Sequence, residues 1–229
     1  MPTTYAHYKF GKEVLSALPR PLQNSIEAHR ELFDIGLHGP DILFYYNALK
    51  KDPVNEQGHT LHEQFADEFF HHAVEVIEKV KDPAAARAYI YGFICHFALD
   101  SECHPYVEKI MQVGRVSHNE IEMELDRMML TEDYHKLFLA PTSGKRKALF
   151  LGMKAVGKYD SLHDIVMSVK PDPLCQKYCK VLKRQYSGAV PLAASLIVQY
   201  QKKLFQDTPL PERFHEAFGA GEEWEKLRL

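Results

Sequence analysis

Five potential metal ligands lie close together in this sequence: His96, Asp100, His104, His118 and Glu122. His96 with Asp100, and His118 with Glu122, each form a His-x-x-x-carboxylate pair. Because residues four apart lie on one face of a helix, one turn above the other, each pair can direct a nitrogen and an oxygen atom to one point. Imidazole and carboxylate groups are typical ligands of zinc and similar divalent ions. The spacing therefore predicts a metal site.

The first pair lies in AAARAYIYGFICHFALD, residues 84–100, a segment that is apolar nearly all round. This pattern predicts a central buried helix. An ionised carboxylate at Asp100 would be costly there unless it is paired or bound to metal. His96 alone would most simply be a hydrogen-bonded core histidine, but the additional ligands nearby favour metal binding. His104 precedes Pro105, so we expect it near the end of the helix, turned toward a neighbouring metal.

Three further candidate ligands lie upstream: His7, Asp41 and His62. Asp41 follows a Gly-Pro turn and precedes an apolar run in HGPDILFYY, so its burial would again require a cation. His7 and His62 are weak candidates by themselves, and His59 is an alternative to His62.

Composition indicates an ordinary globular protein, with 45% hydrophobic and 26% charged residues in a chain of 229. The net charge of -3 provides no electrostatic argument for a polyanionic partner, so we expect no stable nucleic-acid partner. The four cysteines form no CxxC motif and are predicted to be buried free thiols. Neither a signal peptide nor a membrane-spanning segment is evident, so we expect a cytoplasmic protein. The oligomeric state stays open.

Helical periodicity dominates the elements that must position these ligands, and alternating strand patterns are scarce. Ser117 is a plausible N-cap for the helix that carries His118 and Glu122. We predict a single all-α domain over residues 1–229, a multi-helix bundle. Helices are expected over 8–18, 22–37, 41–49, 59–80, 84–100, 118–129 and 172–205, with a loop at 50–58, an uncertain region at 141–160, a bend or break around Pro191 and a short helix in the tail.

In chain order, His7, GPD at 39–41, His62, HFALD at 96–100, His104 and HNEIE at 118–122 resemble the zinc-dependent phospholipase C family. This family shares its fold with the fungal zinc single-strand nucleases. The resemblance implies a mostly helical fold around a zinc cluster that cleaves phosphodiesters. It also implies the ligand sets: Asp41, His62, His96 and Asp100 for one ion, His104, His118 and Glu122 for a second, and His7 and bridging Asp100, with the N-terminal amine and carbonyl, for a third.

The implied chemistry is attack on phosphorus by a metal-activated water, with Asp41 orienting or deprotonating that water. The chain also departs from the family pattern. Secreted members begin at a tryptophan whose amine binds zinc, whereas the only tryptophan here is Trp224. We therefore expect two or three zinc ions. Ile42 follows Asp41 where the choline-lipid enzymes have an aromatic residue, and the aromatic residues at 44–46 are most simply core packing.

The expected function is hydrolysis of a small phosphodiester or a phospholipid headgroup. A single-strand nuclease of the same fold is one alternative, and it would need stacking aromatic residues and a basic groove near the metals. The only compact basic run is Lys145-Arg146-Lys147, which is more simply a solvated loop. A non-catalytic metal-binding protein is the other alternative.

Overall fold

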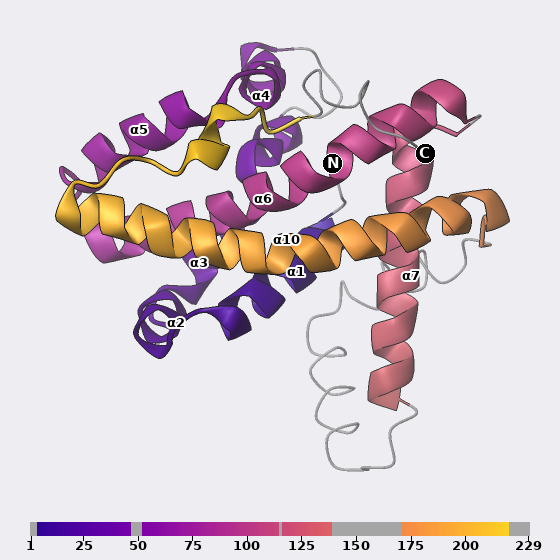
Figure 1. Ribbon diagram of the computed structural model, residues 1–229, viewed down its shortest axis with the longest axis horizontal. Helices are drawn as coiled ribbons and strands as arrows, with labels where there is room; N and C mark the ends of the chain where they lie inside the picture. The colour runs from indigo at the N-terminus through magenta and orange to yellow at the C-terminus, as the bar shows by residue number, and fades with distance from the viewer. Residues whose placement is uncertain (1–3, 47–51, 115, 139–170, 220–229) are drawn as a thin grey trace.

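A computed structural model describes residues 4–46, 52–114, 116–138 and 171–219 of the chain (Figure 1). These residues confirm the predicted all-α fold, because they form helices and, apart from one isolated bridge between Phe65 and Ala217, no β structure. The elements are α1 (Thr4–Ala17), α2 (Arg20–Glu27), α3 (Arg30–Gly36), the 3-10 helix η1 (Gly39–Tyr45), α4 (Pro53–Glu63), α5 (Ala66–Ile77), α6 (Pro83–Val113), α7 (His118–Phe138), α10 (Pro173–Gln206) and the 3-10 helix η2 (Glu212–His215).

Helix α6 is the central element, and α1, α3 and α10 pack against it. It is buried along most of its length, as the apolar segment at 84–100 predicted. Its contact with α3 is unusually close because both helices carry a glycine there. A Cβ atom at Gly36 would lie 2.1 Å from the Tyr89 carbonyl oxygen, and one at Gly92 would lie 2.2 Å from that of Phe33. This approach brings the loop after α3 onto the face of α6.

Helix α10 spans the molecule across α6 and α7 (Figure 1). It runs through Pro191 as one helix, so the break considered at this position is absent. Beyond it, the C-terminal segment turns back over α5, where Phe214 stacks on Phe70 at 4.1 Å between ring centroids. The Tyr200 hydroxyl donates to the Phe70 carbonyl oxygen at 2.9 Å. This aromatic cluster packs on α6 through Phe93 and Phe97.

Two predicted helices are in fact broken. The helix expected over 22–37 divides into α2 and α3 at His29, whose backbone leaves the helical region at φ -132° and ψ 38°. The helix expected over 59–80 divides into α4 and α5 where the backbone at 64–65 is extended. Groups freed at this second break bond to the C-terminal segment, because the Gly219 N–H donates to the His62 carbonyl oxygen and the Ala66 N–H to that of Glu216.

The predicted loop over 50–58 is wrong from Pro53 onward, because this proline opens α4. The Asp52 carboxylate caps the helix by accepting from the N–H groups of Val54 and Asn55 at 2.8 and 3.1 Å. The α-helix expected over 41–49 is instead the shorter η1, which begins earlier, at Gly39. Residues 47–49 of that prediction lie outside the described residues, as do 141–160 with the basic run at 145–147, and Trp224.

Helix α1 begins at Thr4, four residues before its predicted start, and helices α6 and α7 continue well beyond their predicted ends. Helix α6 passes through Pro105 to Val113, so His104 is in mid-helix and not near its end. Residues beyond the proline, including Val107 and Ile110, are buried and keep this part of α6 packed. Helix α7 continues past the expected end at 129. Its predicted N-cap is confirmed: Ser117 accepts from the Glu120 N–H at 3.4 Å, and the Glu120 carboxylate accepts from the Ser117 N–H at 2.7 Å.

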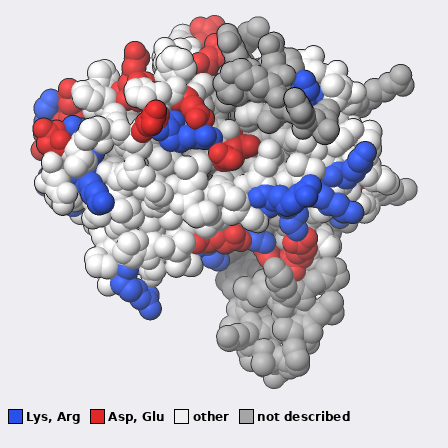
Figure 2. Space-filling view, viewed as in Figure 1, with Lys and Arg blue, Asp and Glu red and all other residues white. Residues whose placement is uncertain are grey.

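Three further observations concern the described residues. No helix among them combines the length and the apolar character that a membrane span requires. On the face shown in Figure 2, basic side chains gather over one end of α10 with acidic side chains next to them, so this face carries no extended patch of a single charge sign.

The predicted burial of the cysteines is confirmed, since Cys95, Cys103, Cys175 and Cys179 are all buried free thiols.

Candidate metal centre

One face of α6 carries three of the predicted ligands. His96, Asp100 and His104 follow one another at intervals of one turn, and Gly92 lies one turn before them at the contact with α3. His96 and Asp100 are fully buried, and His104 is 6% exposed. Helix α6 therefore presents a column of two imidazoles and a carboxylate to the elements packed against it.

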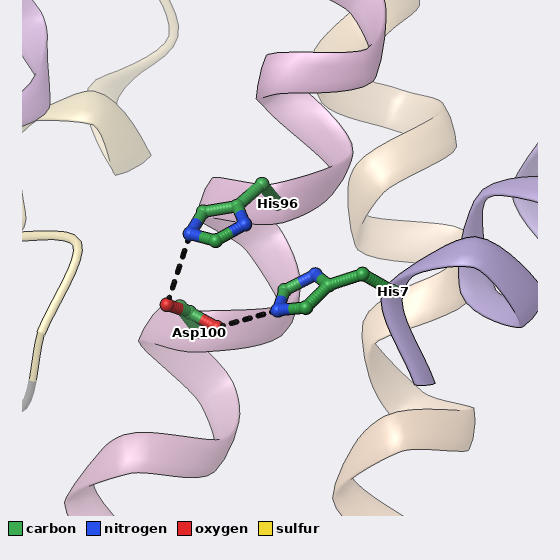
Figure 3. A group of neighbouring side chains, drawn as sticks. All are labelled: His7, His96 and Asp100. Carbon is green, nitrogen blue, oxygen red and sulfur yellow. Dashed lines mark ion pairs between the residues drawn. The ribbon is translucent and has the colours of Figure 1, made fainter. Parts of the chain in front are cut away.

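The first group contains His7, His96 and Asp100 (Figure 3). His7 comes from α1, and its Nε2 atom lies 3.2 Å from Asp100 Oδ1. The other carboxylate oxygen, Oδ2, lies 3.1 Å from His96 Nε2. The two imidazole rings stack at 4.3 Å between centroids with 12° between their planes. Asp100 thus faces two imidazole nitrogens, one with each oxygen.

The second group contains Asp41, His62 and His96. The η1 helix supplies Asp41 and α4 supplies His62, whose Nε2 lies 3.0 Å from Asp41 Oδ1. His96 Nε2 lies 3.9 Å from the same oxygen. His59, the alternative to His62, is not in the group; its ring lies against Phe44, 4.7 Å between centroids. His96 belongs to both the first and the second group, so the two groups adjoin.

The third group contains His104, His118 and Glu122. His118 Nε2 and Glu122 Oε1 are 2.6 Å apart along α7, and His104 Nε2 lies 4.0 Å from the same oxygen. His104 Nε2 is also 3.8 Å from Asp100 Oδ2, which connects this group to the first. The fold therefore brings all eight predicted ligands into three adjoining groups. The predicted role of the N-terminal amine falls on residues 1–3, outside the described residues.

Backbone carbonyls orient two of the imidazoles. His96 Nδ1 lies 3.1 Å from the Leu37 carbonyl oxygen, and His62 Nδ1 lies 2.7 Å from that of Gly58. Since a carbonyl oxygen only accepts, each Nδ1 carries the proton and donates it. Each Nε2 atom then points into the site, where it can ligate a metal when it carries no proton, which is the usual arrangement for a metal-binding histidine.

Gly39 allows Asp41 to reach His96. Its φ of +51° lies in the left-handed region, which residues with a Cβ atom disfavour. The ring of His96 also leaves no room, because a Cβ atom at Gly39 would lie 2.3 Å from its Cδ2 atom. A residue other than glycine would therefore displace either η1 or the imidazole.

The polar atoms at the centre of these groups are buried and lack ordinary hydrogen-bond partners. Within the described part of the chain, no hydrogen bond reaches His7 Nε2, His62 Nε2, His96 Nε2, His104 Nε2, Asp41 Oδ1 or either oxygen of Asp100. Buried polar atoms without partners are costly, and a bound cation satisfies them. This donor set of imidazole nitrogens and carboxylate oxygens fits zinc.

Burial shapes the protonation of the metal-free groups. It lowers the pKa of His7 and His104, and lowers that of His118 to about 4, so these imidazoles are held neutral as ligands must be. Burial likewise raises the pKa of Glu122 well above its usual range.

His96 is the exception. Burial lowers its pKa, but the neighbouring carboxylates of Asp100 and Asp41 outweigh this effect and raise it to about 9. A metal ion binding near pH 7 therefore has to displace the proton of His96.

One buried residue next to the site was missed at the sequence level. Asp126 is 9% exposed, and it accepts hydrogen bonds from the N–H groups of Tyr5 and Ala6, at 3.3 and 3.0 Å. It lies four residues after Glu122, so the face of α7 that carries the ligands continues to it. That spacing was the available signal, but its contact with α1 appears only in the fold.

Comparison with known families gives one match. The model of a family described as zinc-dependent phospholipase C matches residues 6–191, which include all eight side chains of the three groups. The searches of curated proteins and of solved structures gave no match.

Proposed function

We propose that this chain, which belongs to the zinc-dependent phospholipase C family, is a zinc-dependent phosphodiester hydrolase acting on a phospholipid headgroup or another small phosphodiester. The observation that carries the proposal is the convergence of three buried groups of imidazole and carboxylate ligands, joined through His96 and Asp100. A single structural zinc needs one closed set of four ligands. Adjoining groups with shared residues are the arrangement that multi-metal hydrolysis requires.

The three groups define which residues would hold two or three ions. Asp41, His62 and His96 would hold one, His104, His118 and Glu122 a second, and His7 a third, with Asp100 shared between His7 and His96. When bound, zinc ions activate a water molecule for attack on phosphorus at neutral pH and offset the charge that develops on the leaving oxygen.

Within this centre, the chain's own residues orient the reacting groups and move the proton. We assign to the Asp41 carboxylate the role of holding the attacking water and accepting its proton, because it is 6% exposed and lies at the end of η1 that faces His62 and His96. The Leu37 and Gly58 carbonyls keep the imidazoles in the tautomer that ligates.

Exposed aromatic side chains at the end of η1, the helix that supplies Asp41, support a substrate with an apolar part. Tyr45 and Tyr46 are both 57% exposed, so the expectation that they pack in the core is wrong. Phe44 is half-buried and stacks on His62 at 5.7 Å between centroids. A phospholipid offers apolar contacts beside its phosphodiester, and we favour it for this reason.

We also propose a cytoplasmic location, which the four buried free thiols support.

The test is hydrolysis of bis-p-nitrophenyl phosphate, short-chain phosphatidylcholine and single-stranded DNA by the zinc-loaded chain, before and after chelation. We expect chelator-sensitive release of p-nitrophenol and of phosphocholine. His62→Ala should abolish turnover, and His59→Ala, which removes an imidazole outside the three groups, should retain most of it. Turnover of single-stranded DNA alone would assign the nuclease activity instead. No turnover of any substrate by protein that holds zinc would leave a non-catalytic metal-binding protein.

A further inference from the structure

The carboxylate of Asp126 ties the first turn of α1 to α7. Its Oδ1 accepts from the Ala6 N–H at 3.0 Å and its Oδ2 from the Tyr5 N–H at 3.3 Å, in a buried position. The first N–H groups of a helix have no partner within the helix, and a carboxylate there both satisfies them and interacts favourably with the helix dipole. Both oxygens of Asp126 are thereby directed to the backbone of α1.

The residue that follows this anchored turn is His7. Its ring differs from those of His62 and His96, because neither of its nitrogens hydrogen-bonds to any part of the chain that the structure describes. The ring is held by stacking on His96 and by its contact with Asp100 (Figure 3). With no carbonyl to orient the imidazole, its position depends on where the backbone of α1 begins.

Asp126 occupies the same face of α7 as the ligands of the third group. It lies one turn beyond Glu122 and two turns beyond His118. Helix α7 thus carries two ligands of one group and anchors the helix that supplies a ligand to another. This arrangement couples the position of His7 to that of the third group.

We propose that Asp126 is a positioning residue that holds His7 at its metal-binding position through the backbone of α1. The inference rests on the metal centre of the proposed function and adds a residue that binds no metal itself. Removing the carboxylate should weaken binding of the ion that His7 ligates and leave the ion held by Asp41, His62 and His96 in place.

Asp133 offers a matched control, because it also pairs with α1. Its carboxylate accepts from the Tyr5 hydroxyl at 2.7 Å and from Lys9 Nζ at 2.9 Å. These contacts reach the ends of side chains, not the backbone that leads into His7. Asp133→Ala should therefore leave zinc binding unchanged within about twofold.

The experiment compares zinc content and zinc affinity, by competition with a chromophoric chelator, in the full-length wild-type chain and its variants. The variants are Asp126→Ala, Asp126→Asn, His7→Ala, Asp126→Ala with His7→Ala, and Asp133→Ala. Loss of a group that supports a ligand typically costs about 10–100-fold in metal affinity, and we expect a loss of that size for one ion in Asp126→Ala. Asp126→Asn keeps one acceptor oxygen, so its zinc affinity should lie between those of the wild-type chain and Asp126→Ala. This variant provides the test if circular dichroism shows that Asp126→Ala does not fold.

The double variant separates positioning from a general loss of stability. If Asp126 acts only through His7, the double variant binds zinc as His7→Ala does. Zinc binding unchanged in Asp126→Ala, unchanged in His7→Ala, or weaker in the double variant than in His7→Ala would overturn the inference. A wild-type chain that binds zinc but hydrolyses no phosphodiester would refute the proposed function alone, because this readout needs no turnover.

Discussion

Replacing Asp100 by Asn is the sharpest perturbation of the centre, because each oxygen of Asp100 faces a different imidazole. Oδ1 lies 3.2 Å from His7 Nε2, whereas Oδ2 lies 3.1 Å from His96 Nε2 and 3.8 Å from His104 Nε2. Asn keeps the size of the side chain but removes its charge and replaces one oxygen by an NH₂ group, which cannot ligate. The substitution therefore affects more than one ion.

The magnitude follows from what one ligand contributes. Zinc sites with four ligands have binding free energies of about 10–16 kcal/mol, or about 2.5–4 kcal/mol per ligand. At 1.4 kcal/mol per tenfold change, the loss of one ligand weakens each affected ion by about 10²–10³-fold. Asp100→Asn should lose at least one ion per chain at micromolar free zinc, together with the hydrolytic activity.

The assay is elemental analysis of zinc per chain after reconstitution, combined with affinity by chelator competition. Glu124→Gln is the control, because Glu124 is also buried, on α7, where it accepts from Arg127 Nε at 2.8 Å, outside the three groups. It should keep the wild-type zinc content. Wild-type zinc content and affinity in Asp100→Asn would refute the assignment of Asp100 as a shared ligand.

Three further outcomes are expected. Because Asp100 and Asp41 raise the pKa of His96 above its unfolded value to about 9 despite burial, His96 stabilises the metal-free fold below pH 6.5 and loses that contribution as pH rises through 9. Zinc must displace the same proton, so affinity titrations should show about a tenfold gain per pH unit between pH 7 and 9, and a flat profile would contradict the protonation of His96. Gly39→Ala should lower Tm and weaken zinc binding, because alanine at this left-handed φ is strained by about 1–2 kcal/mol and its Cβ would lie against the His96 ring. Gly188→Ala is the control: its Cβ meets no described atom within 4 Å, so it should neither lower Tm nor weaken zinc binding. Free zinc at about 1,000 times Kd adds about 4 kcal/mol per site to the free energy of unfolding, which corresponds to a rise in Tm of about 8–16 °C for a chain of this size. A Tm that does not change when a chelator is added would exclude a metal bound only by the folded state.

The part of the site that could be predicted from the sequence is the part that depends on local helix geometry. His96 and Asp100, like His118 and Glu122, are four residues apart, so a single helix already places each pair on one face. The capping motif before His118 is equally local. What joins the pairs is packing between helices far apart in the chain, and only the resemblance to a family pointed to it.

The helix ends were harder to predict because distant segments determine them. The break between α4 and α5 is stabilised by the Gly219 N–H and the Glu216 carbonyl, which lie about 150 residues further along the chain. A proline such as Pro105 is expected to end a helix, but burial of the residues beyond it keeps α6 continuous. The role of Gly92 likewise depends on meeting Gly36 across a helix contact. None of these effects leaves a periodic pattern in the sequence.

The presence of zinc in these three groups can be measured by anomalous diffraction at the zinc absorption edge, from crystals of the zinc-loaded chain. We expect one peak among Asp41, His62 and His96 and another among His104, His118 and Glu122, with a third beside His7 and Asp100 if the chain holds three ions. Zinc-loaded crystals with no anomalous peak in either of the first two groups would rule out the proposed zinc centre.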